Sequence, residues 1–190
     1  MEKTNIATGK KTGFTTVQIT KMALFVAIIS ASAYISIPIP FTSVMLTAQT
    51  MVICLTGLLL SPLEGGITMV VYWLLGLVGV PVFSGGTAGP ARVFGPGGGF
   101  FIGFIIAVIF IALLRGEKYN LVRYLIVTIV VSMVSIYGCA VVWWKLATGN
   151  TWYASLVATT LPFIPLDTVK CIIAVLLAKP LQKALQAVER

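Results

Sequence analysis

Long apolar stretches separated by short polar segments run through almost the whole chain. Five of them contain no charged residue, at positions 22–63, 65–91, 93–114, 124–144 and 146–166. A membrane-spanning helix needs about 20 mainly apolar residues, so each stretch is long enough to supply one. The pattern predicts six helices, at residues 21–37, 46–60, 66–80, 99–114, 123–146 and 156–178. Several of these are short for a bilayer core of about 30 Å, and a count of five is the alternative.

Composition favours a membrane protein over a water-soluble one. Hydrophobic residues make up 58% of the chain and charged residues 9%, whereas a typical soluble protein is about 25% charged. The net charge of +8 does not indicate nucleic-acid binding, because the basic residues lie at the ends of apolar segments and are not gathered on one face. We therefore expect an all-α membrane protein, with a basic tail at residues 1–20 and one six-helix domain at 21–185.

Lys and Arg residues are concentrated on one side of the expected bundle. That side receives the basic residues of the N-terminal tail, of the 115–123 connection and of the C-terminal end, whereas the other side receives only Arg92 and Lys145. Because cytoplasmic loops are enriched in Lys and Arg, both termini are expected in the cytoplasm. The start of the chain also resembles a cleavable signal peptide, but its apolar character continues to Ile37, which favours a retained first helix.

The connection at residues 80–99 is rich in Gly and Pro and includes Gly85, Gly86 and Gly95. Gly adopts positive φ freely and Pro fixes φ, so the segment predicts a compact irregular loop on the outer side. Phe83 is apolar enough to pack, which favours a lid or cavity wall over the alternative of a flexible linker. No Lys follows the glycines at the helix start, so they do not form a phosphate-binding loop, and ATP-driven transport would need another subunit.

Asp167 and Lys170 lie where ionisable residues are costly. Asp167 precedes Lys179, the expected cytoplasmic end of the last helix, by twelve residues, or about 18 Å at 1.5 Å per residue. A charge at such depth costs at least about 2.5 kcal/mol and normally faces a cavity or the protein interior. The spacing of three puts both side chains on one helical face. Together they supply acceptors and donors for a small neutral group such as a urea. The alternative is a salt bridge that only orders the bundle.

Two further polar residues are candidates for ligand binding. Arg92, in the outer loop, could hold a ligand carboxylate through its bidentate guanidinium, and the alternative is contact with a lipid phosphate. Gln49, near the start of the second expected helix, would be costly if its amide faced lipid.

On the first expected helix, Ala23, Ala27 and Ala31 recur every four residues and form a stripe on which another helix can approach closely. The stripe is either packed inside the bundle or exposed as a docking surface for a partner membrane subunit. The chain has no His, and its three Cys residues lie in apolar segments without metal-ligand spacing, so neither a metal site nor a catalytic centre is expected.

Several segments closely resemble the BioY family, the biotin-specific substrate-capture (S) components of energy-coupling factor (ECF) transporters. The resemblance covers residues 23–178, and the segment ending in Asp167 and Lys170 is its most specific element. The segments are TAQ at 47–49, LLLSP at 58–62, LGLVGVPVFSGG at 75–86, GPGGGF at 95–100 and LPFIPLDTVK at 161–170.

The resemblance implies a fold, a ligand and partners. It implies six transmembrane helices with cytoplasmic termini in a bacterial cell membrane, and a biotin cavity near the outer face beneath the 80–99 lid. Biotin is implied as the transported ligand, with no cofactor. The implied partners are a transmembrane coupling subunit, which docks on the alanine stripe, and two ATPase subunits.

The resemblance also implies residue roles. Asp167 and Lys170 would bind the ureido ring of biotin, Arg92 would contact its carboxylate, Gln49 would face the cavity, and Tyr137 and Trp143 would form walls around the fused rings. The sequence departs from the family pattern at four positions in and around the cavity and lid. These are Gly97, Phe100, Lys145 and Leu166.

Two other functions remain open at the level of sequence. One keeps the S-component architecture but binds another vitamin or a cyclic urea. The other is an intramembrane enzyme that uses Asp167 as a base and Lys170 as its partner, which the lack of His and of a nucleophile motif disfavours.

Overall fold

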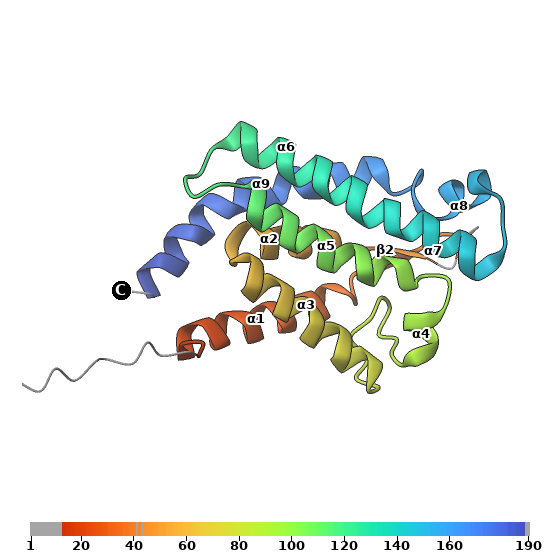
Figure 1. Cartoon of the computed structure of the whole chain (residues 1–190), viewed down its shortest axis with the longest axis horizontal. Helices are drawn as coiled ribbons and strands as arrows, with labels where there is room; N and C mark the ends of the chain where they lie inside the picture. The colour runs from red at the N-terminus through yellow and green to blue at the C-terminus, as the bar shows by residue number, and fades with distance from the viewer. Residues whose placement is uncertain (1–12, 41, 43, 189–190) are drawn as a thin grey trace, which may run out of the picture.

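The structure, a computed structural model, describes residues 13–40, 42 and 44–188. It is mostly helical, as expected, but it also contains a pair of short strands (Figure 1). The elements in chain order are α1 (Thr16–Ser32), β1 (Ser36–Pro38), β2 (Met45–Thr47), α2 (Gln49–Leu59), α3 (Pro62–Leu77), α4 (Pro90–Phe94), α5 (Gly98–Leu114), α6 (Leu121–Ser132), the π-helical segment η1 (Met133–Tyr137), α7 (Gly138–Thr148), α8 (Trp152–Thr159) and α9 (Ile164–Val188).

Side-chain caps fix where the first helices begin. Thr15 and Gln18 form a capping box, with the Thr15 hydroxyl accepting from the Gln18 N–H and the Gln18 side chain accepting from the Thr15 N–H. The first helix therefore begins before residue 21, inside the segment expected to be a tail, most of which (1–12) lies outside the described residues. Ser61 and Glu64 form the same box at the start of α3, with Pro62 at the first helical position.

An antiparallel strand pair replaces the expected start of the second helix. Ser36 pairs with Thr47 and Pro38 with Met45. The expectation of helix from residue 46 is wrong because Thr47 is still in the strand and its hydroxyl accepts a hydrogen bond from the Gln49 N–H, where α2 begins. The first helix likewise ends at Ser32, before the strand, and does not continue to residue 37.

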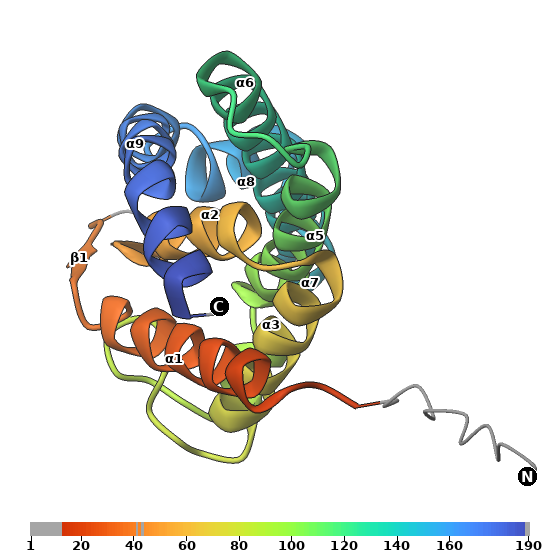
Figure 2. The same cartoon turned by 90° about the vertical axis from the view of Figure 1, so that its left-hand side faces the viewer.

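Helix α2 occupies the centre of the bundle (Figure 2). Helices α1, α3, α5, α6 and α9 surround it, and nearly all of its side chains are buried. Gly99 and Gly103 of α5 face η1 and α7 so closely that a Cβ on Gly99 would lie 2.5 Å from the Cys139 carbonyl oxygen. The start of α1, the end of α9 and the α5–α6 connection lie at one end of the bundle, and α4 and the α7–α8 connection at the other (Figure 1).

Among the described residues, one helix is long and apolar enough by itself to cross a membrane. It spans Leu121–Thr148 and includes η1. The last expected helix is wrong as one straight element, because α8 and α9 are separate and meet at a bend of 47°. Pro162 lies in the break and cannot donate a helical hydrogen bond, while Pro165 is tolerated in the first turn of α9. Helices α1, α2, α3 and α5 are apolar but shorter, at 10–17 residues each.

Candidate ligand-binding site

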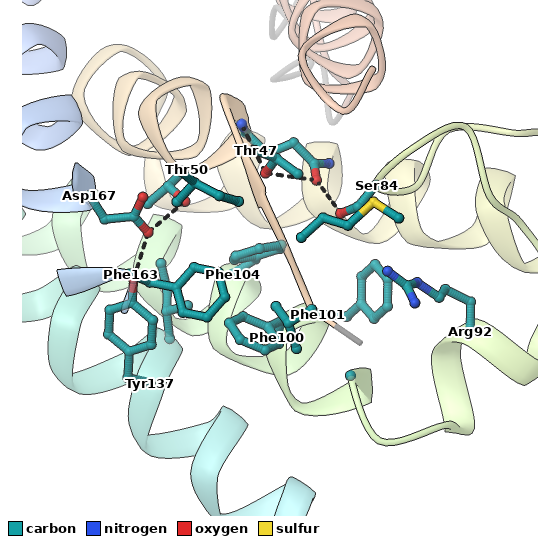
Figure 3. A pocket seen from close by; sticks show the side chains of 16 residues that line it. Thr47, Thr50, Ser84, Arg92, Phe100, Phe101, Phe104, Tyr137, Phe163 and Asp167 are labelled. Carbon is teal, nitrogen blue, oxygen red and sulfur yellow. Dashed lines mark hydrogen bonds between the residues drawn. The ribbon is translucent and has the colours of Figure 1, made fainter. Parts of the chain in front are cut away.

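A pocket lies between β2, α2, α5, η1, the start of α9 and the loop that carries α4 (Figure 3). Its atom-free space is about 630 Å³, a figure that includes the open solvent at its mouth. Apolar side chains from α5 and η1 line the middle, and polar side chains lie at both ends. The lining side chains include Thr47, Gln49, Thr50, Ser84, Arg92, Phe100, Phe101, Phe104, Ile136, Tyr137, Phe163 and Asp167.

The Asp167 carboxylate forms one polar end of the pocket and is 4% exposed. Its Oδ2 accepts hydrogen bonds from the Thr50 hydroxyl (3.0 Å) and from the Tyr137 hydroxyl (2.6 Å), and its Oδ1 accepts one from Lys170 Nζ (2.6 Å). Donors from α2, η1 and α9 thus converge on one carboxylate. Asp167 lies in the first turn of α9, not mid-helix as expected, and the positive end of the helix dipole also favours the anion there.

Lys170 supports this carboxylate from beside the pocket. Its ammonium lies 2.6 Å from Asp167 and also donates to the Thr47 carbonyl of β2 at 2.7 Å. The structure therefore brings the two residues together on one helix face. Lys170 itself is not among the pocket-lining residues, so its direct contact with a ligand stays a prediction.

The π-helical segment η1 positions Tyr137. A π-helical turn takes in one more residue than an α-helical turn, which shifts the side chains that follow it around the helix axis, and such segments recur at functional sites. Here the shift leaves Ile136 and Tyr137 buried on the pocket side, while Val134 is 68% exposed on the outside. Sequence reasoning predicted an uninterrupted helix over 123–146 and missed this segment, for which the residue pattern carries no signal.

Arg92 forms the other polar end. It stands on α4, half-buried, across the aromatic side chains Phe100 and Phe101 from Asp167 (Figure 3). Burial lowers the pKa of its guanidinium from the ordinary value, and the nearby Tyr72 partly offsets this. In the described part of the chain no carboxylate pairs with Arg92. A desolvated guanidinium of this kind is suited to a ligand carboxylate.

Aromatic rings fill the space between the two ends. Phe100 lies 6.4 Å from Tyr137, centroid to centroid, in an edge-to-face arrangement, and Phe101 lies 4.4 Å from Phe83. Phe104 follows Phe100 by one helical turn of α5. Sequence reasoning identified Phe83 as a lid residue but did not identify Phe100, Phe101 and Phe104 as site residues, nor Thr50 and Ser84. The one available signal was the i, i+4 spacing of Phe100 and Phe104 on a single helical face.

Two expected site residues contact the lid. The Gln49 amide, 2% exposed, lines the pocket but is bound to Tyr72 and to Ser84 of the lid loop. Trp143 does not line the pocket. Its Nε1 donates to the Gly95 carbonyl at 2.9 Å, and its ring lies against Gly98, so it holds the end of the lid loop in place. The expected role of Trp143 as a wall around the ligand finds no support in this geometry.

The 80–99 loop is packed and ordered by specific contacts. Phe83 is fully buried, and its ring lies where a Cβ on Gly76 would be. Gly85 and Gly86 have φ of 71° and 72°, a backbone conformation that side chains other than Gly rarely adopt. These contacts fit a lid or cavity wall better than a flexible linker.

The alanine stripe of α1 faces outward. Ala23, Ala27 and Ala31 are all exposed, while the opposite face of the helix buries Phe25 and Ile29. Of the two readings of the stripe, the geometry favours the exposed surface over packing inside the bundle.

Comparison with known proteins places the chain in a family. The family model described as the BioY family matches residues 4–187. A probable biotin transporter BioY from Pyrococcus horikoshii is 38% identical over 87% of this chain and 96% of the relative. The biotin transporter BioY2 from Lactococcus lactis is 33% identical over 88% of this chain and 91% of the relative.

The fold is also similar to a solved one. A crystal structure of the S-component for biotin from an ECF-type ABC transporter superposes with a TM-score of 0.83 at 28% identity, and covers 90% of this chain and 95% of its own. Sequence match and fold agree. The chain belongs to the BioY family.

Proposed function

We propose that this chain binds biotin with high affinity and is the substrate-specific subunit of an ATP-driven ECF-type vitamin importer. The observation that carries the proposal is the arrangement of the pocket. A hydrogen-bonded carboxylate and a guanidinium that pairs with no carboxylate of the described residues lie at opposite ends of an aromatic channel. Biotin has the complementary order of groups: a ureido ring, an apolar sulfur-containing ring and alkyl chain, and a carboxylate.

In the proposed complex Asp167 accepts a ureido N–H. The Thr50 and Tyr137 hydroxyls keep its carboxylate oriented, and Lys170 compensates its charge. Phe100 and the neighbouring aromatic side chains contact the apolar rings and chain, and the Arg92 guanidinium binds the carboxylate. Few, precisely oriented polar groups in an apolar pocket give specificity in small-molecule sites.

The proposed topology has six membrane crossings with both termini in the cytoplasm. The crossings are α1, α2, α3, α5, the continuous helix Leu121–Thr148 and the bent pair α8–α9. Many large apolar side chains are exposed around the bundle, such as Val134, Leu146 and Leu176, as expected for a surface in contact with lipid. Basic residues of the described chain support the orientation. The α5–α6 connection, which contains Arg115 and Lys118, and the end of α9, which contains Lys183, lie at the end of the bundle opposite to α4, which carries Arg92 (Figure 1).

The proposed partners are a transmembrane coupling subunit and two ATPase subunits in the bacterial cell membrane. The exposed alanine stripe of α1 is a surface on which a helix of the coupling subunit can approach closely. The chain itself is proposed to act by binding and not by catalysis.

Biotin titration of the full chain in detergent, without nucleotide, tests the proposal. We expect stoichiometric heat release by calorimetry and a higher melting temperature with biotin. Absence of both would overturn it. A competition panel against labelled biotin, containing other vitamins and simple cyclic ureas, distinguishes a different ligand, and chemically altered biotin after long incubation would indicate an enzyme.

A further inference from the structure

A continuous chain of hydrogen bonds joins the pocket to the lid loop through Gln49. The Ser84 hydroxyl of the loop donates to Gln49 Oε1 at 3.0 Å. Gln49 Nε2 donates to the Tyr72 hydroxyl at 2.6 Å, and this hydroxyl donates to the carbonyl of Val82, again in the loop, at 3.1 Å. The loop is therefore bound on both sides of Phe83 by one amide and the phenol attached to it.

This chain of bonds is buried. Gln49 is 2% and Tyr72 1% exposed, and Tyr72 comes from α3 without lining the pocket. A buried amide whose partner is removed loses the bond and keeps the cost of its desolvation, so each link depends on the others. The hydrogen bonds of Gln49 to Tyr72 and Ser84 therefore account for a polar side chain at this position without any contact to a ligand.

The end of α1 binds the same loop from the other side. The Tyr34 hydroxyl donates to the Pro81 carbonyl at 2.6 Å, and the Gly85 N–H donates to the Ala33 carbonyl at 3.0 Å. Gly86 lies against the Tyr34 ring, where an added Cβ would come within 2.9 Å of a ring carbon. Tyr34 is 58% exposed and does not line the pocket.

We propose that Gln49 is a positioning residue that latches the lid. Through Ser84 and Tyr72 it holds residues 81–87 over the pocket, and Tyr34 holds the same segment to the end of α1. The latch sets how long a ligand stays bound, because the lid must detach from Gln49 and Tyr34 before the pocket opens. The inference has two parts. The lid half, that these hydrogen bonds hold residues 81–87 in place, does not depend on the proposed function. The ligand half, that they set how long a ligand stays bound, rests on the proposed biotin binding.

Amide hydrogen exchange of the ligand-free full chain tests the lid half directly. Tyr72→Phe and Tyr34→Phe each remove one hydroxyl outside the pocket. We expect exchange in the peptide covering 81–87 to become about tenfold faster in each variant, because one net hydrogen bond is lost, while exchange in α5 and α9 stays unchanged and reports an intact fold. Unchanged exchange of the lid peptide in both variants would overturn the proposal whether or not biotin binds.

Biotin release from the same variants tests the ligand half. We expect the dissociation rate to rise about tenfold in Tyr72→Phe and in Gln49→Leu. The double variant should release biotin faster than either, but by less than the product of the two single effects, because both changes remove the Gln49–Tyr72 bond while the bonds to Val82 and Ser84 are each removed by one of them. Tyr34→Phe combined with Gln49→Leu should be faster than either, since those attachments are separate.

A different pattern would show that Gln49 contacts the ligand. Faster release from Gln49→Leu together with wild-type release from Tyr72→Phe and Ser84→Ala would assign the amide to the ligand and reject the latch. If no variant and no wild-type protein binds biotin, the proposed function fails, and the lid exchange still decides on the latch.

Discussion

At one end of the pocket Asp167 is held by donors from α2, η1 and α9, whereas at the other Arg92 stands on the five-residue helix α4 with no carboxylate beside it among the described residues. The first end is carried by long helices and its hydrogen bonds are already made. The second is carried by the short helix α4 within the lid loop, and no described carboxylate balances its charge.

The difference indicates that the two ends of the pocket contribute differently to binding. Groups held on packed helices keep their geometry without a ligand, so binding to them costs little ordering. A cation on a loop gains its best partner only when an anion arrives, so the ligand's own charge can help to close the site. We expect the Asp167 end to dominate affinity and the Arg92 end to distinguish acids from neutral analogues.

Replacing Asp167 by Asn should have the largest effect. The change leaves the Lys170 ammonium partly buried without its counterion and replaces an acceptor of the ureido N–H by an amide. Breaking a buried charge pair costs about 2–5 kcal/mol, so calorimetry should show biotin binding weakened by about 30-fold or more.

The double variant Asp167→Asn with Lys170→Met provides the control for stability. It removes both charges, so the melting temperature should recover relative to Asp167→Asn, while biotin affinity should not. Wild-type affinity in Asp167→Asn would mean that the ligand does not use this end of the pocket.

Replacing Arg92 by Gln should weaken biotin binding by about 10- to 100-fold, corresponding to about 1.5–3 kcal/mol for a hydrogen bond to a charged group. The neutral analogue biotinol should bind wild type and variant alike, because it has no carboxylate to lose. An equal loss for biotin and biotinol would assign Arg92 to lid structure and remove the contrast between the two ends.

Tyr137→Phe should reduce biotin affinity by about tenfold, because it deletes one hydrogen bond to the Asp167 carboxylate while leaving the ring in place. Trp143→Phe is the matched change on the same long helix, and its side chain contacts the lid loop instead. We expect it to alter equilibrium affinity less than about threefold. A larger loss of biotin affinity in Trp143→Phe than in Tyr137→Phe would assign Trp143 to the wall of the ligand site.

Ala27→Leu should have the smallest effect on biotin affinity, less than about twofold, because Ala27 is exposed on α1. The same change should abolish co-purification with the coupling subunit, since a larger side chain prevents close helix approach. Val142→Leu, at another exposed position, is the control and should leave the complex intact. Loss of the complex in both variants would argue against a specific stripe.

Charged residues within apolar segments could be recognised from the sequence as site candidates, because a charge in such surroundings is energetically costly. Asp167 and Lys170 could be paired from spacing alone, and the structure places them 2.6 Å apart. Thr50 and Phe104 could not be identified, because hydroxyl and aromatic residues are common in membrane helices and only tertiary packing decides which ones face a cavity. Gln49 was recognisable as polar and costly, but its partners depend on the loop path.

Helix boundaries could likewise be predicted only where the local sequence determines them. The expected helix 99–114 agrees with α5 to within a residue, since apolar character alone defines it. The expected helix 66–80 begins four residues too late and ends three too late compared with α3, although the capping pattern of Ser61 and Glu64 could have indicated the start at Pro62. Pro162 and Pro165, three residues apart, could have indicated the break before α9, but the expected helix 156–178 ran through it. The strand pair was not predicted, and its contacts with Lys170 and with Gly85 of the lid come from distant parts of the chain.

The π-helical segment makes this helix respond differently to a lost and to an added residue. A π-helical turn takes up one residue more than an α-helical turn, so deleting a single residue such as Val134 would let η1 relax to α-helix while the segments on either side keep nearly the same relative orientation. An inserted residue would instead turn the side chains before η1 by about 100° relative to those after it, which would separate Ser132 from Cys171 or Tyr137 from Asp167. Lengthening the helix by one residue at this point is therefore a change of binding site, whereas shortening it by one is not.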